Sequence, residues 1–224
     1  MSATEFFEAL RAGDVDAINF HLDSDPSLAS AQNQSGISAV LMCVYTSRRD
    51  ICDLLLARGA VLQLYDAAAV GDLGRVKEFV EHDPRFVSSF SPDGFPVFAL
   101  AAVFGHLDIV RYLAQSGADI DGTATNGSGY NALTGAVASG HIDIVYLLLQ
   151  RGANPNHRYG LGYSPLLTAA ANGHLEIVKL LLAHGADPHA VSDDGKSALA
   201  LADERNHAAV AEFLRNHLAA SRQS

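Results

Sequence analysis

Three histidines stand in almost identical surroundings, and histidine is a residue type that binds metals and transfers protons. The segments GHLDIVRYL, GHIDIVYLL and GHLEIVKLL begin at Gly105, Gly140 and Gly173. In each segment an acidic residue follows the histidine two positions later. Imidazole and carboxylate groups are common zinc ligands, and the same pair serves in general acid–base catalysis. The recurrence therefore raises three hypotheses: a metal site, a catalytic device or a structural repeat.

The spacing of the three histidines argues against a shared metal ion. His106, His141 and His174 recur with a period of about 33 residues, which is typical of stacked structural repeats. Equivalent positions on packed helices lie ~10 Å apart, whereas two ligands of one zinc lie within ~4 Å of each other. We therefore expect these imidazoles to bond to nearby backbone and to bridge neighbouring turns. We expect no metal site and no cofactor.

Other patterns that could carry chemistry are weak. His184 and His189 flank a predicted helix end, and His157 lies in a predicted hairpin, so all three are typical of solvated loops. The glycine-rich GLGYSP lacks the lysine and the strand-to-helix context of a phosphate-binding loop. No Ser/His/Asp arrangement has support from its spacing. We expect no catalytic residue.

Composition and charge exclude several classes of protein. The chain of 224 residues has a formal net charge of −10, which opposes nucleic-acid binding. The same charge would favour a partner with a basic surface, although a merely solubilising surface explains it as well. Its two cysteines are too few for a disulfide framework or a four-cysteine zinc site. No long apolar run or secretory signal is present. We expect a soluble, cytoplasmic monomer without membrane contact.

A repeated unit organises the whole chain. Weaker copies of the histidine-containing phrase stand at Gly13, Ser47, Gly71 and Asn206. Apolar residues at helical spacing follow each copy. Several copies end at a glycine, which tolerates the left-handed conformation that closes a helix. The predicted unit is a short helix, a tight turn, a longer helix and a turn-rich loop.

This unit resembles the ankyrin repeat. That family has a short helix written TPLHxAA and a longer one written GHxxIVxxLLxxGAD. The second phrase matches well in the three clearest copies, and the first matches best at residues 164–170, SPLLTAA. The histidine of TPLH is replaced by Ala99, Thr134, Leu167 and Ala200. The resemblance gives that histidine a structural role, so its loss affects the regularity of the repeat and not its function. Paired DP openings also resemble small bacterial-type ankyrin proteins.

The resemblance covers essentially the entire chain and implies an all-α fold. We expect an ankyrin-repeat solenoid of about seven helix-turn-helix units, with β-hairpin loops, called fingers, between them. The chain would form a single domain, 1–224. Its predicted units are 2–34, 35–62, 63–92, 93–127, 128–160, 161–193 and 194–219, followed by a tail, 220–224, that frays.

One connection breaks the pattern. After Gly59 the chain runs as AVLQLYDAAAVGD straight into a new helix, which leaves no room for a hairpin. We interpret this as a missing finger near residues 60–66. Residues 7–60 also align with residues 65–118 at a constant offset, so the first two units look like a duplicate of the next two. The third unit, as a copy of the first, would then begin as the first repeat of a chain does, without a finger in front of it.

In the ankyrin family, partners bind to a concave groove formed by the fingertips and the short helices. Aromatic residues are enriched in binding hot spots, and three of them each follow the glycine before a short helix. They could equally pack against an adjacent hairpin. The other candidates lie at a fingertip or just before a helix-ending glycine. The full set of predicted partner-binding residues is Phe95, Phe104, Tyr130, Ser139, Arg158, Tyr159, Tyr163 and Asn172. We expect Phe104 to be the most informative, because an exposed large apolar residue needs a partner.

The resemblance implies a non-catalytic scaffold or regulator that binds another protein in its groove. This is an argument by analogy of fold. Two alternatives stay open. One is a structural or assembly module with obligate association, and the other is an enzyme whose site the sequence does not reveal.

Overall fold

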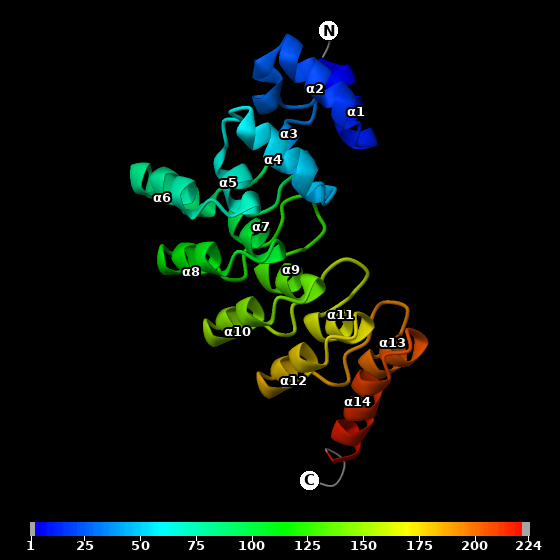
Figure 1. Cartoon of the computed structure of the whole chain (residues 1–224). Helices are drawn as coiled ribbons and strands as arrows, with labels where there is room; N and C mark the ends of the chain where they lie inside the picture. Colours follow the sequence, from blue (N-terminus) through cyan, green and yellow to red (C-terminus); the bar gives the residue numbers. More distant parts are fainter. Residues whose placement is uncertain (1–2, 221–224) are drawn as a thin grey trace. The chain divides into compact units, whose positions relative to one another are not determined.

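The computed structural model describes residues 3–220 of the chain (Figure 1). Fourteen α-helices and two short 3₁₀ helices run through these residues. They form two compact units, the first ending at Val97 and the second beginning at Phe98. Each unit has its own set of buried apolar side chains. The single domain expected for residues 1–224 stays a prediction, as do its internal boundaries.

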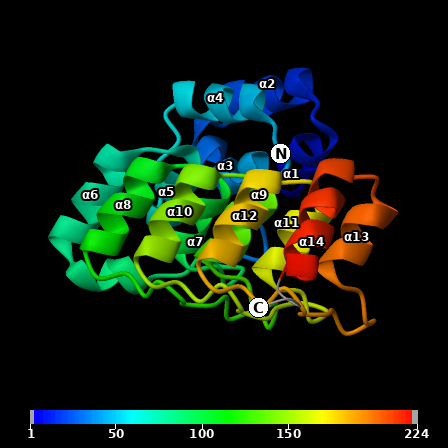
Figure 2. The same cartoon turned by 90° about the horizontal axis from the view of Figure 1, so that it is seen from below.

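The first unit is a stack of helix pairs. Its helices are α1 (Ala3–Ala12), α2 (Val15–Ser24), η1 (Pro26–Ser30), α3 (Ala39–Tyr45), α4 (Arg49–Ala57), α5 (Leu64–Val70), α6 (Leu73–His82) and η2 (Pro84–Ser88). The first helices of the pairs pack in succession, α1 on α3 and α3 on α5, and each also packs on its own second helix. Figures 1 and 2 show α4 and α6 on different sides of the α3–α5 pair. The second helices of this unit therefore do not form one continuous row.

The second unit consists of two parallel rows. Its helices are α7 (Val97–Val103), which starts at the last residue of the first unit, α8 (Leu107–Gln115), α9 (Ala132–Ser139), α10 (Ile142–Gln150), α11 (Pro165–Ala171), α12 (Leu175–Ala183), α13 (Ala198–Glu204) and α14 (Ala208–Ala220). Helices α9, α11 and α13 pack side by side, and α8, α10, α12 and α14 form the second row (Figure 2). The predicted all-α repeat fold is confirmed.

Local sequence explains where these helices begin and end. The side chains of Asp14, Ser38 and Ser164 each accept a hydrogen bond from a backbone N–H group in the first turn of the following helix. These N–H groups have no carbonyl partner within the helix, so the caps stabilise the helix start. Gly71 and Gly140 end α5 and α9 in the left-handed conformation, which glycine adopts without the steric cost of a Cβ atom. N-terminal caps and C-terminal glycines of this kind recur along the chain because the sequence of the repeat recurs.

The connections between pairs differ in length. Residues 151–164 link α10 to α11 and residues 184–197 link α12 to α13, whereas only residues 58–63 link α4 to α5. Isolated β-bridges close several of the longer loops, for example between Tyr159 and Tyr163. The missing finger near residues 60–66 stays an interpretation of the short connection. The tail predicted to fray, 220–224, lies outside the described residues except for Ala220, which ends α14.

Candidate protein-binding face of the second unit

The repeated histidines of the second unit join neighbouring helix pairs. The Nε2 atom of His141 donates to the carbonyl oxygen of Val103 at 3.1 Å. A Cβ atom added at Gly105 would lie 2.7 Å from the same ring. His174 lies against Gly140 in the same way. The prediction that these imidazoles bond to backbone and bridge turns is confirmed for His141.

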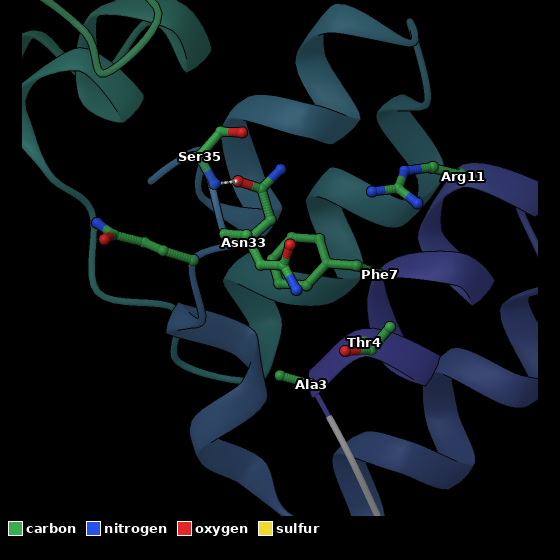
Figure 3. Close-up of a pocket in the computed structure, with 8 residues that line it drawn as sticks. Ala3, Thr4, Phe7, Arg11, Asn33 and Ser35 are labelled. Atoms are coloured by element: carbon green, nitrogen blue, oxygen red, sulfur yellow. Dashed lines mark hydrogen bonds between the residues drawn. The ribbon is translucent and has the colours of Figure 1, made fainter.

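Within residues 3–220, no group of three or more His, Cys, Asp or Glu side chains is placed to hold a metal ion. A pocket of about 300 Å³ lies between α1 and the loop before α3 in the first unit (Figure 3). Its walls are the Phe7 ring, amide and hydroxyl side chains, and Arg11 at one edge. The eight lining residues include no acid, histidine or cysteine, so they offer no pair of groups for proton transfer.

Three loops of the second unit are hydrogen-bonded to one another. We call them the finger row: residues 124–130, 157–163 and 191–197. The amide of Gly160 donates to the Ser128 carbonyl at 3.0 Å, and the amide of Asp193 donates to the Leu161 carbonyl at 3.1 Å. The ring of His157 adds a bond from Nε2 to the Gly129 carbonyl at 2.7 Å. The backbone of the middle loop is thus held from both sides.

Side chains tie the same loops together. Arg158 donates to the Val191 carbonyl and to the Asp193 carboxylate, both at 2.9 Å. The Tyr130 and Tyr159 rings lie 4.8 Å apart between their centroids. Arg158, predicted to bind a partner, is exposed and also links two loops. Tyr130, predicted for the same role, is 38% exposed.

Tyr159 corrects the sequence prediction. It is predicted to lie at a fingertip and to bind a partner, but only 7% of it is exposed and its hydroxyl bonds to that of Thr168. Burial raises the pKa of its phenol to about 12. The residue is therefore packed inside the finger row and offers little surface to a partner. Its burial follows from packing against Tyr130 of the preceding loop, which a local pattern does not reveal.

The remaining predicted residues are distributed unevenly. Ser139 and Asn172 are exposed at the ends of α9 and α11, and the Asn172 amide donates to the Ala138 carbonyl at 3.1 Å. Tyr163 is half-buried beside Tyr159. Phe104, expected to be exposed, is half-buried. Phe95 belongs to the first unit and is half-buried. The structure thus brings Tyr130, Arg158 and Tyr163 together in the finger row, with the two helix-end residues on the adjoining helices.

Leu161 is the residue that the sequence prediction missed. It is 77% exposed, more than any other large apolar side chain of residues 3–220. It stands between Gly160 and Gly162, both of which have positive φ angles. In the sequence, GLGYSP shows only that it is no phosphate-binding loop, and a single apolar residue is not by itself a signal, because isolated exposed apolar residues are common on protein surfaces. The neighbouring α9 and α11 contain no charged residue, and the Arg158–Asp193 pair forms the charged edge beside Leu161.

No helix within residues 3–220 combines the length and the apolar character needed to cross a bilayer. The finger row is thus a set of loops bonded to one another that presents apolar and aromatic side chains. Such a surface is suited to contact with another protein.

Comparison with known proteins agrees with this geometry. The family described as "Ankyrin repeats (3 copies)" matches residues 64–159, and that described as "Ankyrin repeats (many copies)" matches residues 148–202. Alpha-latrocrustotoxin-Lt1a of Latrodectus tredecimguttatus is 28% identical over 115 residues, which are 48% of this chain and 8% of the toxin. Ankyrin repeat and SAM domain-containing protein 6 of Mus musculus is 38% identical over 58 residues, 26% of this chain and 7% of that protein.

The chain thus spans less than a tenth of each of these relatives, and the likeness concerns the repeats. Ankyrin repeats are generally modules for protein–protein interaction, and the family is generally non-catalytic. The two family matches, the paired helices and the bonded loops support one assignment: the chain belongs to the ankyrin-repeat family.

Proposed function

We propose that the chain is a non-catalytic, cytoplasmic scaffold or regulator, a monomer that binds another protein through the finger row of its second unit. The observation that carries the proposal is Leu161, an apolar side chain 77% exposed on a backbone bonded from both sides. Tyr130, Tyr163, Ser139 and Asn172 would surround this anchor. Phe95 and Phe104 are weaker candidates because they are half-buried.

The hydrogen bonds between the loops of the finger row hold them in place before a partner binds. A loop that is already ordered loses little conformational entropy when a partner binds, so more of the contact energy appears as affinity. Full burial of an exposed leucine contributes about 1.5–3 kcal/mol. The Arg158–Asp193 pair at the edge is exposed, and an exposed pair of this kind contributes little by itself. Leu161 should therefore dominate the affinity, and the charged edge should orient the partner.

The test is capture of partners on the immobilised chain, with quantitative mass spectrometry. Leu161→Asp should lower recovery of the principal partner about tenfold or more, because a charge replaces the apolar anchor. Tyr146→Asp is the matched control, since Tyr146 is also an exposed apolar residue of the second unit but lies on α10. Both variants should keep the unfolding free energy within about 0.5 kcal/mol. Equal recovery with Leu161→Asp and the unchanged chain would overturn the proposal.

A further inference from the structure

A second exposed ring lies on α2 of the first unit. Phe20 is 61% exposed, whereas the next residue, His21, is buried. The two rings meet edge to face with centroids 6.0 Å apart, and the His21 ring lies 6.2 Å from that of Phe6. The Phe20 ring thus rests on a buried aromatic neighbour while most of it is open to solvent.

The repeat itself shows that the fold does not require an aromatic residue at this position. Helix α6 is the counterpart of α2, since Asp14 and Asp72 both cap the start of these helices. In that register Phe20 corresponds to Glu78, an exposed residue paired with Arg75 at 2.8 Å. The same position on the same kind of helix therefore takes a charged residue without loss of the fold. The packing of the helix therefore does not require an aromatic ring at Phe20.

Carboxylates lie one helical turn to either side of the ring. Asp16 precedes Phe20 by four residues and Asp23 follows it by three, so all three share one face of α2. Asp23 accepts a bond from Arg58 at 2.8 Å. Asp16 is exposed and has no cationic partner among residues 3–220. A negative charge thus stands beside the open ring.

The charge around this face is strongly unbalanced. The acidic residues of segment 3–30 are Glu5, Glu8, Asp14, Asp16, Asp23 and Asp25, and its only lysine or arginine is Arg11. Two arginines of α4 also reach this segment: Arg48 donates to the Gly13 carbonyl, and Arg58 donates to Asn19 and Asp23. The corresponding segment around α6 contains Arg75, Lys77 and Arg85. The first helix pair therefore has a larger local excess of acid than its counterpart, and this excess favours a basic partner.

We propose that Phe20 and Asp16 form a docking surface for an arginine in a basic segment of a partner protein. A guanidinium group binds over an aromatic face within ~6 Å of its centroid, and helix neighbours four residues apart lie ~5–6 Å from each other. One guanidinium can therefore lie over the Phe20 ring and also bond to the Asp16 carboxylate. This surface belongs to the first unit, and the inference does not depend on the finger row.

A similar pair of an acid and an exposed ring on α10 differs in its neighbours. Tyr146 is exposed and follows Asp143 by three residues. Glu176 and Lys179 line the same hollow, and they form an ion pair at 2.7 Å, so a paired lysine lies beside this ring. We therefore assign arginine binding to α2 and use Tyr146 as the control.

The absence of tryptophan from the chain makes the test direct. In a Phe20→Trp variant the single indole reports on this face, and tryptophan is the best aromatic partner for a cation. We would titrate it with a peptide of repeated Gly-Arg-Ser and with the same peptide in which glutamine replaces arginine. Saturable quenching by the arginine peptide alone is the expected result. The unchanged chain should show amide NMR shifts at residues 15–24 with that peptide.

Two variants distinguish the contribution of the aromatic ring from that of apolar area and from that of the carboxylate charge. Phe20→Leu keeps an apolar side chain but has no aromatic face, and should weaken binding about two- to fivefold. Asp16→Asn should weaken it about twofold, and Tyr146→Leu should leave it unchanged. The proposal fails if Phe20→Leu binds as well as the unchanged chain, or if the glutamine peptide binds equally. It also fails if no saturation occurs at millimolar peptide, or if the quenching reflects self-association of the chain.

Discussion

A buried carboxyl group joins two helix pairs of the first unit. Asp66, in the first turn of α5, is only 1% exposed. Its side chain accepts a bond from the Ser38 hydroxyl at 2.5 Å and one from the Gln63 amide at 2.9 Å. Ser38 in turn caps α3. The carboxyl stands at the place where TPLH has its histidine, so an acid here provides the polar link between repeats.

Burial raises the pKa of Asp66 from 3.8 to about 6, against the opposing effect of its two hydrogen bonds. The folded chain therefore holds this proton more tightly than the unfolded chain does. The stability that the protonated group contributes is present below about pH 4 and is lost as the pH rises towards 6. The shift corresponds to about 3 kcal/mol. Between pH 4 and pH 7, Asp66→Asn should gain stability relative to the unchanged chain, as measured by urea unfolding. A difference that is constant with pH would contradict the assignment, and Asp53→Asn, exposed on α4, is the control.

Single residues also mark the limit of sequence reasoning. The glycine stops and the histidine bridge could be predicted, because both repeat with the phrase that specifies them. Tyr159 could not be placed, since its burial depends on Tyr130 in another loop. The exposure of Leu161 depends likewise on bonds from both flanking loops. Local periodicity predicts helices, whereas the proposed partner face lies where successive loops meet.

At the scale of elements, the second helix of one pair is fixed against the end of the first helix of the preceding pair. Gly105 has a φ angle of +85°, and the His141 ring occupies the space that a side chain would need. Two constraints therefore act on one residue, the left-handed backbone and the close ring. The same geometry recurs between Gly173 and His207. The glycine and the histidine of the repeated segment thus specify how one helix pair packs against the next.

This double constraint predicts a difference between two glycines with nearly the same backbone. Gly152 has a φ angle of +87° and open space around its Cβ position. Gly152→Ala should cost about 1–2 kcal/mol, the price of the left-handed conformation alone. Gly105→Ala should cost about 1–3 kcal/mol more, because the His141 ring must move. Urea unfolding of the two variants measures both values. Equal losses of unfolding free energy in the two variants would show that the His141 ring moves aside without cost. The contact would then not fix the junction between the helices.

At the scale of the whole molecule, two electrostatic effects oppose each other. The net charge of −10 destabilises the folded state by self-repulsion. Ion pairs such as Arg58–Asp23 and Lys196–Glu204 act in the opposite direction, but their side chains are largely exposed. Exposed pairs contribute about 0–1 kcal/mol each at most. Repulsion among unpaired acids should therefore be the larger effect, and it is concentrated in the first unit, where acids most exceed bases.

The salt dependence of the melting temperature provides the test. Salt screens both the repulsion and the ion pairs, so the larger of the two effects determines whether the melting temperature rises or falls. Raising the ionic strength from about 0.01 to 0.15 M shortens the screening length from about 30 to 8 Å. We expect the melting temperature to rise, by about 2–4 °C for each 1 kcal/mol gained. Differential scanning calorimetry with sodium chloride measures this, and an uncharged osmolyte of equal osmolality controls for solvent effects. A fall in melting temperature would mean that the exposed ion pairs dominate. A rise would mean that this chain holds surplus acid at a cost to its own stability, as expected if the charge serves a basic partner.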